Sequence, residues 1–219
     1  MISVVALDMA GTTVVDGGAV EASFHDAFEA LGLAATDAQL DHVRTTMGQS
    51  KIEVFTALLG DQEAARRATG AFEAAYERRV VADGVEPIAG VEELLAALRT
   101  RGVRTCLTTG FSDTTRSMLL DRLGWAGLVD LALSPGDGVR GRPHPDLVLT
   151  AAIRLGAEDV RHVAVAGDTA NDLVAGTRAG ASIVAGVLTG AHDRATLEAT
   201  PHTHILDSVT DLLAVVDAS

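Results

Sequence analysis

Cysteine and aromatic residues are scarce in this sequence of 219 residues. The single cysteine, Cys106, excludes a disulfide framework and fits a reducing compartment; we expect it to be packed inside a strand. Aromatic residues make up 3% of the chain, so we expect a core of alanine, valine and leucine. No segment approaches the roughly 18 uninterrupted apolar residues of a membrane span, and no basic region typical of a signal peptide opens the chain. We therefore expect a cytoplasmic protein.

Positive charge is scarce as well. Thirty acidic residues outnumber seventeen basic ones, which leaves a net charge of −13. The phosphates of a nucleic acid or an anionic membrane would be repelled, so neither is an expected partner. Apolar residues nevertheless reach 47%, which excludes a disordered chain. The length suits one domain, or one domain that carries a modest insertion.

Lysine occurs only once. The seventeen basic residues comprise Lys51 and sixteen arginines. Arginine stays protonated in proteins, whereas a lysine can become a neutral, nucleophilic amine. Lys51 is therefore a candidate for a chemical role that arginine cannot fill; the alternative is an ordinary solvated surface lysine.

Short apolar runs, which predict buried strands, alternate with helical patterns along most of the chain. The runs cover Val4–Leu7, Val103–Thr108, Leu128–Leu133, His162–Ala166 and Ser182–Val187. The helical patterns lie near Val91–Arg101, Thr114–Leu123, Pro145–Leu155 and Asn171–Ala179, with Pro145 at a first helical position. An edge strand at Thr203–Leu206 and a closing helix from Asp207 complete the series. This alternation predicts an α/β fold with a Rossmann-like parallel sheet covered by helices on both faces.

The segment 19–82 breaks the alternation. Apolar residues recur there at helical spacing, as at Phe24, Phe28 and Leu31, and no strand-like run occurs. We expect about four helices, the second of which begins at Asp37. The chain therefore divides into a core domain, residues 1–18 and 83–219, and a helical cap domain, residues 19–82, inserted after the first strand. Beside the carboxyl edge of the sheet, such an insert would act as a lid over a site.

Unusual residues follow four of the predicted strands, at the edge where open α/β sheets bind their ligands. In chain order, the four motifs are Asp8-Met9-Ala10-Gly11-Thr12-Thr13, Thr108-Thr109-Gly110-Phe111, Gly141-Arg142-Pro143-His144-Pro145 and Gly167-Asp168-Thr169-Ala170-Asn171-Asp172. Together they offer carboxylates from two strands, a hydroxyl with backbone amides at a helix start, and a cation.

That set of groups suits phosphoryl chemistry. Two or more carboxylates can hold Mg²⁺ in a shell of oxygen ligands. Thr109 and the Gly110 amide are placed to bind phosphate oxygens at a helix N-terminus. Arg142 would neutralise charge in the transition state, and one carboxylate could accept the phosphoryl group as a nucleophile.

The ordered quartet of motifs resembles the haloacid dehalogenase superfamily over essentially the whole chain. The resemblance implies that Asp8 is the nucleophile, that Arg142 stands where most members have lysine, and that Mg²⁺ is bound. The implied metal ligands are Asp8, the Ala10 carbonyl, Asp168 and Asp172. The implied substrate contacts in these motifs are Gly11, Thr12, Thr109 and Gly110. The alternatives are a turn-capping role for Asp8, a helix-capping role for Asp172 and a surface ion pair for Arg142.

Three features resemble the phosphonatase branch, whose members cleave the carbon–phosphorus bond of phosphonoacetaldehyde. Ala10 stands where most phosphatases of the superfamily have a second aspartate, Arg142 replaces lysine, and Lys51 follows Met47-Gly48 at the spacing of the branch's Schiff-base lysine. An iminium on Lys51 would accept the electrons of the breaking bond, while Asp8 takes the phosphoryl group. For Lys51 to start neutral, its pKa must fall below about 10.4, and we expect burial to lower it. With Gly48, Met47 is a candidate substrate contact, or it packs between lid helices.

Other positions depart from the branch. Val54 stands where the family has histidine, Gly18-Ala19 replaces a cysteine position, and Asp146 replaces an aromatic residue. The predicted substrate is therefore phosphonoacetaldehyde or a related 2-oxoalkyl phosphonate. A phosphate-monoester phosphatase or phosphomutase is the alternative enzyme, and a non-catalytic phosphate-binding module is a third reading. The resemblance also implies a homodimer.

Overall fold

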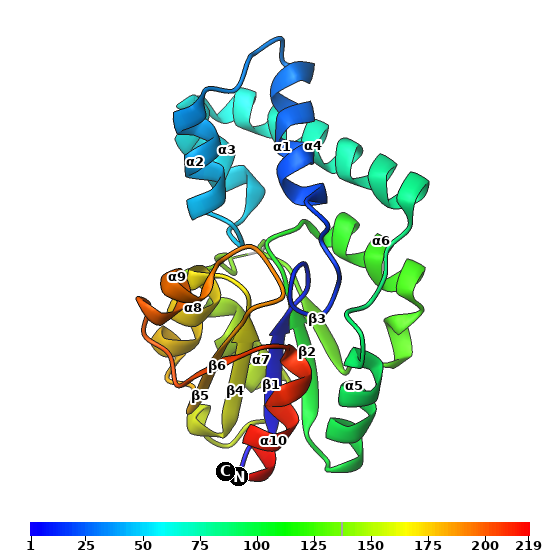
Figure 1. The fold of residues 1–219 in the computed structure, drawn as a ribbon, viewed down its shortest axis with the longest axis vertical. Helices are drawn as coiled ribbons and strands as arrows, with labels where there is room; N and C mark the ends of the chain where they lie inside the picture. Colours follow the sequence, from blue (N-terminus) through cyan, green and yellow to red (C-terminus); the bar gives the residue numbers. More distant parts are fainter. Residues whose placement is uncertain (137) are drawn as a thin grey trace.

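The computed structural model describes residues 1–136 and 138–219, in which four helices stand above one edge of a six-stranded sheet (Figure 1). The strands are β1 (Val4–Asp8), β2 (Arg104–Thr108), β3 (Leu131–Leu133), β4 (Val163–Gly167), β5 (Ile183–Val187) and β6 (His204–Leu206). The α-helices are α1 (Ala19–Ala30), α2 (Asp37–Thr45), α3 (Lys51–Leu59), α4 (Gln62–Asp83), α5 (Val91–Thr100), α6 (Asp113–Leu123), α7 (Asp146–Arg154), α8 (Ala170–Ala179), α9 (Arg194–Glu198) and α10 (Leu212–Asp217). Short 3₁₀ helices occupy Trp125–Gly127, Val160–His162 and Val209–Asp211.

All neighbouring strands of the sheet are parallel, in the order β3-β2-β1-β4-β5-β6. The chain builds β2 and β3 on one side of β1 and then crosses to β4 on the other side. The carboxyl ends of β1 and β4 therefore lie at the point where the direction of winding reverses, which is where open α/β sheets bind ligands. The predicted α/β fold with a parallel sheet is confirmed.

Both faces of the sheet are buried, as the continuous apolar strands predict. Successive side chains of a strand point to opposite faces. Val4 and Ala6 pack on one face with apolar residues of α7 and α8, whereas Val5 and Leu7 pack on the other face with residues of α5 and α10. The strands whose carboxyl ends form this edge are therefore packed between helices on both faces.

The aromatic residues gather outside the sheet. Six of the seven in the chain form one cluster of neighbouring rings, with centroids 4.7–6.4 Å apart: Phe24, Phe28, Phe55, Phe72, Tyr76 and Phe111. All except Phe111 belong to α1, α3 or α4. Valine, alanine and leucine dominate the buried core around the sheet, but aromatic packing joins α1, α3 and α4.

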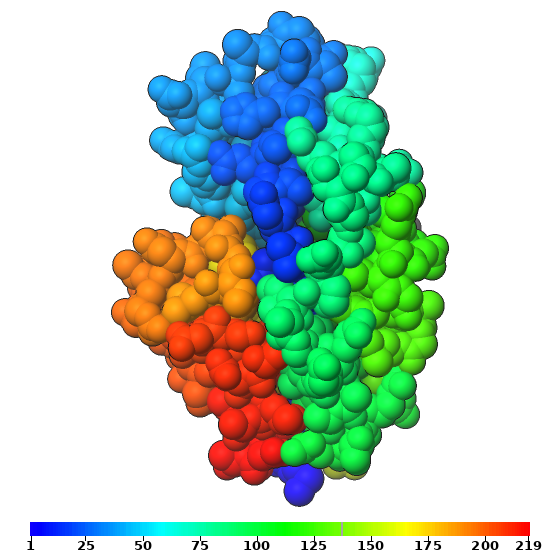
Figure 2. Space-filling model, turned by 45° about the vertical axis from the view of Figure 1, so that its right-hand side comes forward, coloured from blue at the N-terminus to red at the C-terminus, as the bar shows by residue number. Residues whose placement is uncertain are grey.

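Helices α1–α4 occupy the segment predicted to be helical, and α2 begins at Asp37 as expected. The longest of them, α4, has 22 residues, and no helix in the described ranges is long and apolar enough to cross a membrane. Two connections run side by side to the rest of the chain, visible where the blue and green segments meet in Figure 2. The Val15 N–H donates to the Glu86 carbonyl at 3.0 Å, and the Ile88 N–H donates to the Thr13 carbonyl at 3.0 Å.

Several predicted boundaries are wrong. β3 has three residues rather than six, because the chain first turns through the 3₁₀ helix Trp125–Gly127. α7 begins at Asp146, one residue after Pro145, which lies at its N-cap. The closing α-helix begins at Leu212 and follows a 3₁₀ turn, and the five-residue α9 was not predicted, because so short a helix carries little periodicity.

Candidate active site

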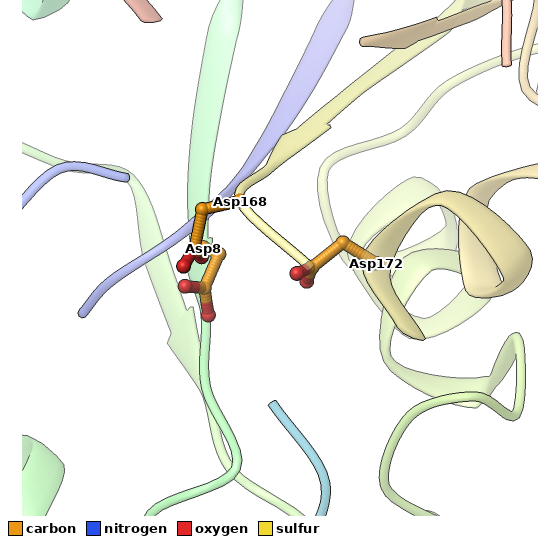
Figure 3. Close-up of side chains that lie close together, drawn as sticks. All are labelled: Asp8, Asp168 and Asp172. Atoms are coloured by element: carbon orange, nitrogen blue, oxygen red, sulfur yellow. The ribbon is translucent and has the colours of Figure 1, made fainter. Parts of the chain in front are cut away.

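Three buried carboxylates converge at the carboxyl edge of the sheet. Asp8 is the last residue of β1, Asp168 follows the end of the neighbouring β4, and Asp172 lies in the first turn of α8. Each offers one carboxylate oxygen to a group whose atoms lie within 4.8 Å of one another (Figure 3). Parallel strands that end at the same edge bring together residues 160 positions apart in the sequence.

Asp168 is held from two sides. Its Oδ1 accepts a hydrogen bond from the Thr12 hydroxyl at 3.1 Å, and its Oδ2 accepts one from the Ala191 N–H at 2.7 Å. Gly11 permits this close packing, since a Cβ there would lie 2.5 Å from Oδ2 and its φ is +85°. Burial, and next the charge of Asp172, raise the pKa of Asp168 to about 6.

Both carboxylate oxygens of Asp172 have hydrogen-bond partners. Its Oδ2 accepts from the Thr169 N–H at 3.1 Å and from the Thr169 hydroxyl at 2.5 Å, which completes a capping box at the start of α8. Its Oδ1 pairs with Arg142. The capping role therefore does not exclude a role in the site.

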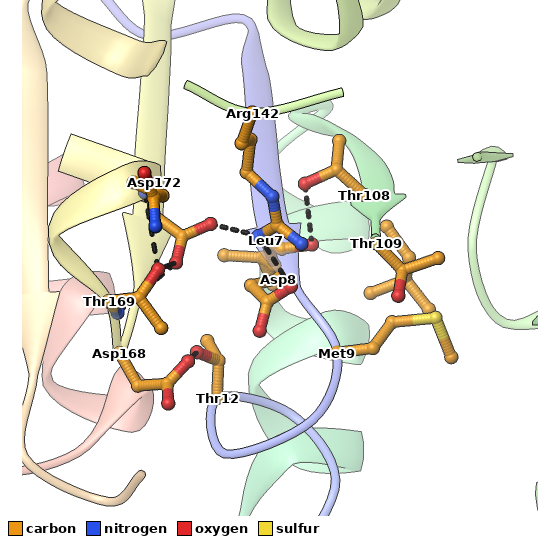
Figure 4. Close-up of polar contacts among 12 residues, drawn as sticks. Leu7, Asp8, Met9, Thr12, Thr108, Thr109, Arg142, Asp168, Thr169 and Asp172 are labelled. Atoms are coloured by element: carbon orange, nitrogen blue, oxygen red, sulfur yellow. Dashed lines mark hydrogen bonds and ion pairs between the residues drawn. The ribbon is translucent and has the colours of Figure 1, made fainter. Parts of the chain in front are cut away.

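Arg142 joins two of the carboxylates (Figure 4). Its Nη1 lies 2.5 Å from Asp8 Oδ1 and also donates to Asp172, and only 3% of its surface is exposed, so it is not a surface ion-pair partner. Burial alone would lower the pKa of Arg142, but the charges of Asp172 and Asp8 raise it. Its Nε has no hydrogen-bond partner among the described residues. A buried, permanently charged donor is thus available to an anionic group.

Asp8, at the centre of this cluster, is 4% exposed. Burial raises its pKa well above the usual value for an aspartate, Arg142 opposes that shift, and the charges of Asp172 and Asp168 add to it. Such crowding of negative charge favours a bound cation. It also destabilises the ionised carboxylate, as suits a nucleophile that is neutralised by reaction.

A cavity of about 40 Å³ lies between this cluster and helices α1–α4. One water molecule needs roughly 10–15 Å³, so the cavity suits a small ligand. Its lining residues are Asp8, Ala10, Asp16, Val20, Met47, Gly48, Lys51, Thr109, Gly110, Phe111, Arg142, Asp168, Thr169 and Ala191. The structure thereby brings together Asp8, Lys51, Arg142 and most of the other predicted site residues.

Lys51 is the first residue of α3 and is 6% exposed, so the solvated-lysine alternative is wrong. Its Nζ lies 3.4 Å from the Gln49 carbonyl oxygen. Burial, and next the charge of Arg142, lower the pKa of Lys51 from 10.5 to about 8, although Asp8, Asp16 and Asp168 oppose the shift. A substantial fraction of the amine is therefore neutral near pH 8.

Three aromatic rings surround the Lys51 amine. Nζ lies 5.1 Å from the ring centroid of Phe111, 5.5 Å from that of Phe72 and 5.7 Å from that of Phe24. Ring faces attract a cation, yet they also exclude water from it. No motif marks these residues as part of the site; the scarcity of aromatic residues is the one signal in the sequence that points to them.

Residues 47–50, here called the lid loop, press against the core. A Cβ on Gly110 would lie 2.7 Å from the Gly48 carbonyl oxygen. The Asn171 Nδ2 donates to the Met47 carbonyl at 2.7 Å, and the Gln49 Nε2 donates to Asn171 Oδ1 at 3.1 Å. Met47 lines the cavity and also packs against the apolar cluster; its contact with a substrate stays a prediction.

Two of the predicted substrate contacts lie elsewhere. Gly11 and Thr12 are absent from the described cavity lining: Thr12 donates to Asp168 and Gly11 leaves room for its carboxylate, because the turn after β1 directs them toward β4. Thr109 and Gly110 do line the cavity, and the Thr109 hydroxyl accepts from the Phe111 N–H at 3.2 Å. Asp16 is a lining residue that the sequence analysis missed, although its position before Gly17 in the connection to α1 was visible.

The comparisons with known proteins agree with this geometry. A family model described as haloacid dehalogenase-like hydrolase matches residues 2–180. A phosphonoacetaldehyde hydrolase from Bordetella pertussis is 31% identical, covering 95% of this chain and 89% of its own. A probable phosphatase, IndB, from Dickeya dadantii is 27% identical over 98% of this chain and 93% of its own.

A solved structure has the same fold. It is a phosphonoacetaldehyde hydrolase-like protein from Oleispira antarctica, with a TM-score of 0.86, 24% identity, and coverage of 99% of this chain and 92% of its own. With the family match over most of the chain, these similarities confirm the resemblance stated from the motifs. The chain belongs to the haloacid dehalogenase-like hydrolases and is similar to the phosphonoacetaldehyde hydrolases among them.

Proposed function

We propose that this hydrolase cleaves the carbon–phosphorus bond of phosphonoacetaldehyde, or of a related 2-oxoalkyl phosphonate. The observation that carries the proposal is the position of the only lysine. Lys51 lines the same small cavity as Asp8, and its pKa is lowered to about 8 by burial and by Arg142. A nucleophilic amine and a nucleophilic carboxylate in one cavity suit a substrate that has a carbonyl group at one end and a phosphonate at the other.

The Lys51 amine would attack the carbonyl carbon, and loss of water would leave an iminium ion. The electrons of the carbon–phosphorus bond then move toward the iminium nitrogen and form an enamine. At the same time an Asp8 oxygen bonds to phosphorus. Water hydrolyses the aspartyl phosphate to inorganic phosphate, while protonation and hydrolysis of the enamine release acetaldehyde, in the case of phosphonoacetaldehyde, and free Lys51.

This route explains why Ala10 is tolerable. A phosphate ester needs an acid to protonate its leaving oxygen, a contribution of about 10²–10⁴-fold. Here the leaving carbon keeps its electrons in the enamine and needs no proton when the bond breaks. The buried Arg142 is placed to balance the charge of the phosphonate oxygens.

The donor set fits Mg²⁺, which favours oxygen ligands. Asp8 and Asp168 would hold the ion, with the Ala10 carbonyl and with Asp172 as a ligand or just behind the ligands. The raised pKa values of Asp8 and Asp168 reflect in part the negative charges around them. When bound, the ion would neutralise the carboxylates and the phosphonate oxygens.

We also propose that α1–α4, residues 19–82, act as a cap domain over a core domain of residues 1–18 and 83–219. The lid loop supports this division, since it closes the cavity from above through Met47 and Gly48. A homodimer remains a prediction, which sedimentation or size-exclusion measurements in solution can test.

A phosphate-monoester phosphatase or phosphomutase is the second candidate. The observation that favours it is Val54, which is 2% exposed and packs in the apolar cluster where the phosphonatase branch has a histidine. In that case Asp8 and the metal ligands would act without Lys51.

Reductive trapping tests the proposal. The protein is incubated with Mg²⁺, phosphonoacetaldehyde and borohydride, and the modified residue is located by mass spectrometry. We expect a two-carbon adduct on Lys51, inactivation, and release of phosphate and acetaldehyde from the untreated sample. The N-terminal amine is the only competing site, since the chain has one lysine.

Lys51→Arg is the matched control, because it keeps a positive charge but cannot form the imine. We expect it to abolish both the adduct and carbon–phosphorus cleavage. Turnover of phosphate esters that survives in Lys51→Arg, with no adduct in the wild type, would replace this proposal with the phosphatase.

A further inference from the structure

The cavity contains one acid–base group for which the proposed chemistry has no use so far. Of the ionisable residues in its lining, Asp8, Asp168 and Arg142 serve the phosphoryl side and Lys51 the carbonyl side. Asp16 is the remaining one. It lies in the connection between β1 and α1, outside the carboxylate cluster, and is partly buried.

Asp16 lies where the cavity opens outward. With Met47 and Ala191 it lines both the inner cavity and a larger outer one of about 610 Å³. One of its oxygens, Oδ1, accepts from the Val20 N–H at 3.1 Å at the start of α1. The Gly18 N–H also acts on this carboxylate, so backbone groups on the side of α1 hold Asp16 in place while it lines the cavity.

Asp16 and the Lys51 amine shift each other's pKa through their charges. Burial raises the pKa of Asp16, its hydrogen bonds with backbone N–H groups lower it, and the charge of Lys51 lowers it as well. Reciprocally, Asp16 raises the pKa of Lys51. An aspartate whose affinity for a proton is increased, lining the same cavity as an amine whose affinity is decreased, is suited to exchange that proton.

Schiff-base formation requires such an exchange, and the two obvious positions cannot supply it. Ala10 has no acid–base side chain, and Val54 is an apolar residue in the packed cluster. We propose that Asp16 is the catalytic residue that moves protons between Lys51 and the carbonyl oxygen of the substrate. This inference rests on the proposed function, and it assigns a step of that reaction that the other lining residues leave open.

The steps balance as follows. The Asp16 carboxylate takes one proton from the Lys51 ammonium group, and the neutral amine forms a bond to the carbonyl carbon. A second proton passes from the nitrogen to the carbonyl oxygen, which gives a carbinolamine. Protonated Asp16 then donates its proton to the hydroxyl group, the carbon–oxygen bond breaks, water leaves, and the iminium ion remains beside the Asp16 carboxylate.

Asp16→Asn tests the assignment, because asparagine keeps an oxygen that can accept from the Val20 N–H but cannot carry the proton. We expect kcat and the rate of borohydride trapping on Lys51 to fall about 10²-fold or more. Binding of inorganic phosphate in the presence of Mg²⁺, measured by calorimetry, should stay at the wild-type affinity, and Asp16→Glu should recover part of the trapping rate.

Asp61→Asn is the matched control. Like Asp16, Asp61 accepts a hydrogen bond from a backbone N–H in the first turn of a helix, here from Ala64 in α4, but it lies outside the cavity lining. We expect wild-type trapping and turnover in this variant. Equal loss in both variants would assign the effect to helix capping and overturn the proposal.

The outcomes separate the two proposals. A Lys51 adduct in the wild type that forms equally fast in Asp16→Asn overturns the role of Asp16 and leaves the proposed function standing. No adduct in the wild type overturns both. A slow adduct in Asp16→Asn, with phosphate affinity unchanged, supports both.

Discussion

Burying Lys51 lowers the stability of the folded protein, and Lys51→Met should remove that cost. Lys51 is 6% exposed, and its pKa falls from 10.5 to about 8, chiefly because of burial and also because of Arg142. At about 1.4 kcal/mol per pKa unit, this fall corresponds to about 3 kcal/mol. Methionine has similar length and packs well against aromatic rings. We therefore expect Lys51→Met to raise the free energy of unfolding at pH 7 by about 3 kcal/mol.

The size of this gain depends on pH in a defined direction. Below pH 8 Lys51 is protonated in both states, so the wild type carries the full cost. Between pH 8 and 10.5 the unfolded chain binds more protons at Lys51 than the folded one, so the stability of the wild type rises relative to the variant. Above about pH 10.5 the amine is neutral in both states. The advantage of Lys51→Met should therefore be constant up to about pH 8 and then shrink by about 3 kcal/mol.

Urea unfolding of both proteins, followed by circular dichroism from pH 7 to pH 10.5, measures this difference. Other titrating groups are common to both proteins and cancel. Arg66→Met is the control, since Arg66 is exposed on α4 and arginine does not titrate in this range. A stability difference between Lys51→Met and the wild type that does not change with pH would refute the reasoning.

Three further perturbations follow from the packing. Arg142→Ala leaves two buried carboxylates without their cation, so in metal-free buffer the free energy of unfolding should fall by about 3–5 kcal/mol. Mg²⁺ should restore part of this loss. Unfolding measured with and without chelator checks the prediction, and unchanged stability would contradict it. Gly110→Ala places a Cβ 2.7 Å from the Gly48 carbonyl oxygen and should displace the lid loop; the KM for phosphonoacetaldehyde should rise about tenfold or more, which corresponds to about 1.4 kcal/mol. Gly70→Ala is its counterpart, because a Cβ at this position in α4 meets no atom within 4 Å; thermal unfolding should show a gain of roughly 0.5–1 kcal/mol and unchanged KM.

Local pattern was sufficient to predict much of this protein. Apolar runs bounded by polar residues predicted the strands to within a few residues, because a strand buried on both faces has little room for polar side chains. The switch from strand runs to helical spacing after Gly18 predicted the helices α1–α4. The order of the four motifs, and the presence of a single lysine, were enough to identify the family and to single out Lys51 as a chemical group.

The predictions from sequence were wrong or incomplete where contacts between distant parts of the chain determine the local structure. The chain turns into β3 through a 3₁₀ helix whose Gly127 carbonyl accepts from Arg99, a contact with α5 that no local pattern signals. No local pattern signals that Thr12 donates to Asp168 or that Gly11 packs against the same carboxylate. Asp16 had no motif to mark it, and only the position of the connection to α1 brings it to the cavity.

The sequence by itself therefore determined the parallel sheet, the edge at which Asp8 and Asp168 meet, and the one side chain with a primary amine. Strand period, helix period and residue chemistry are local properties, and parallel strands bring their ends to one edge. Only the tertiary structure decided how readily Lys51 loses its proton. Its pKa depends on water excluded by rings from three separate segments, at Phe24, Phe72 and Phe111, and on a guanidinium that arrives from beyond β3. Desolvation and charge depend on distance in space, so the chemistry of the amine is set by packing.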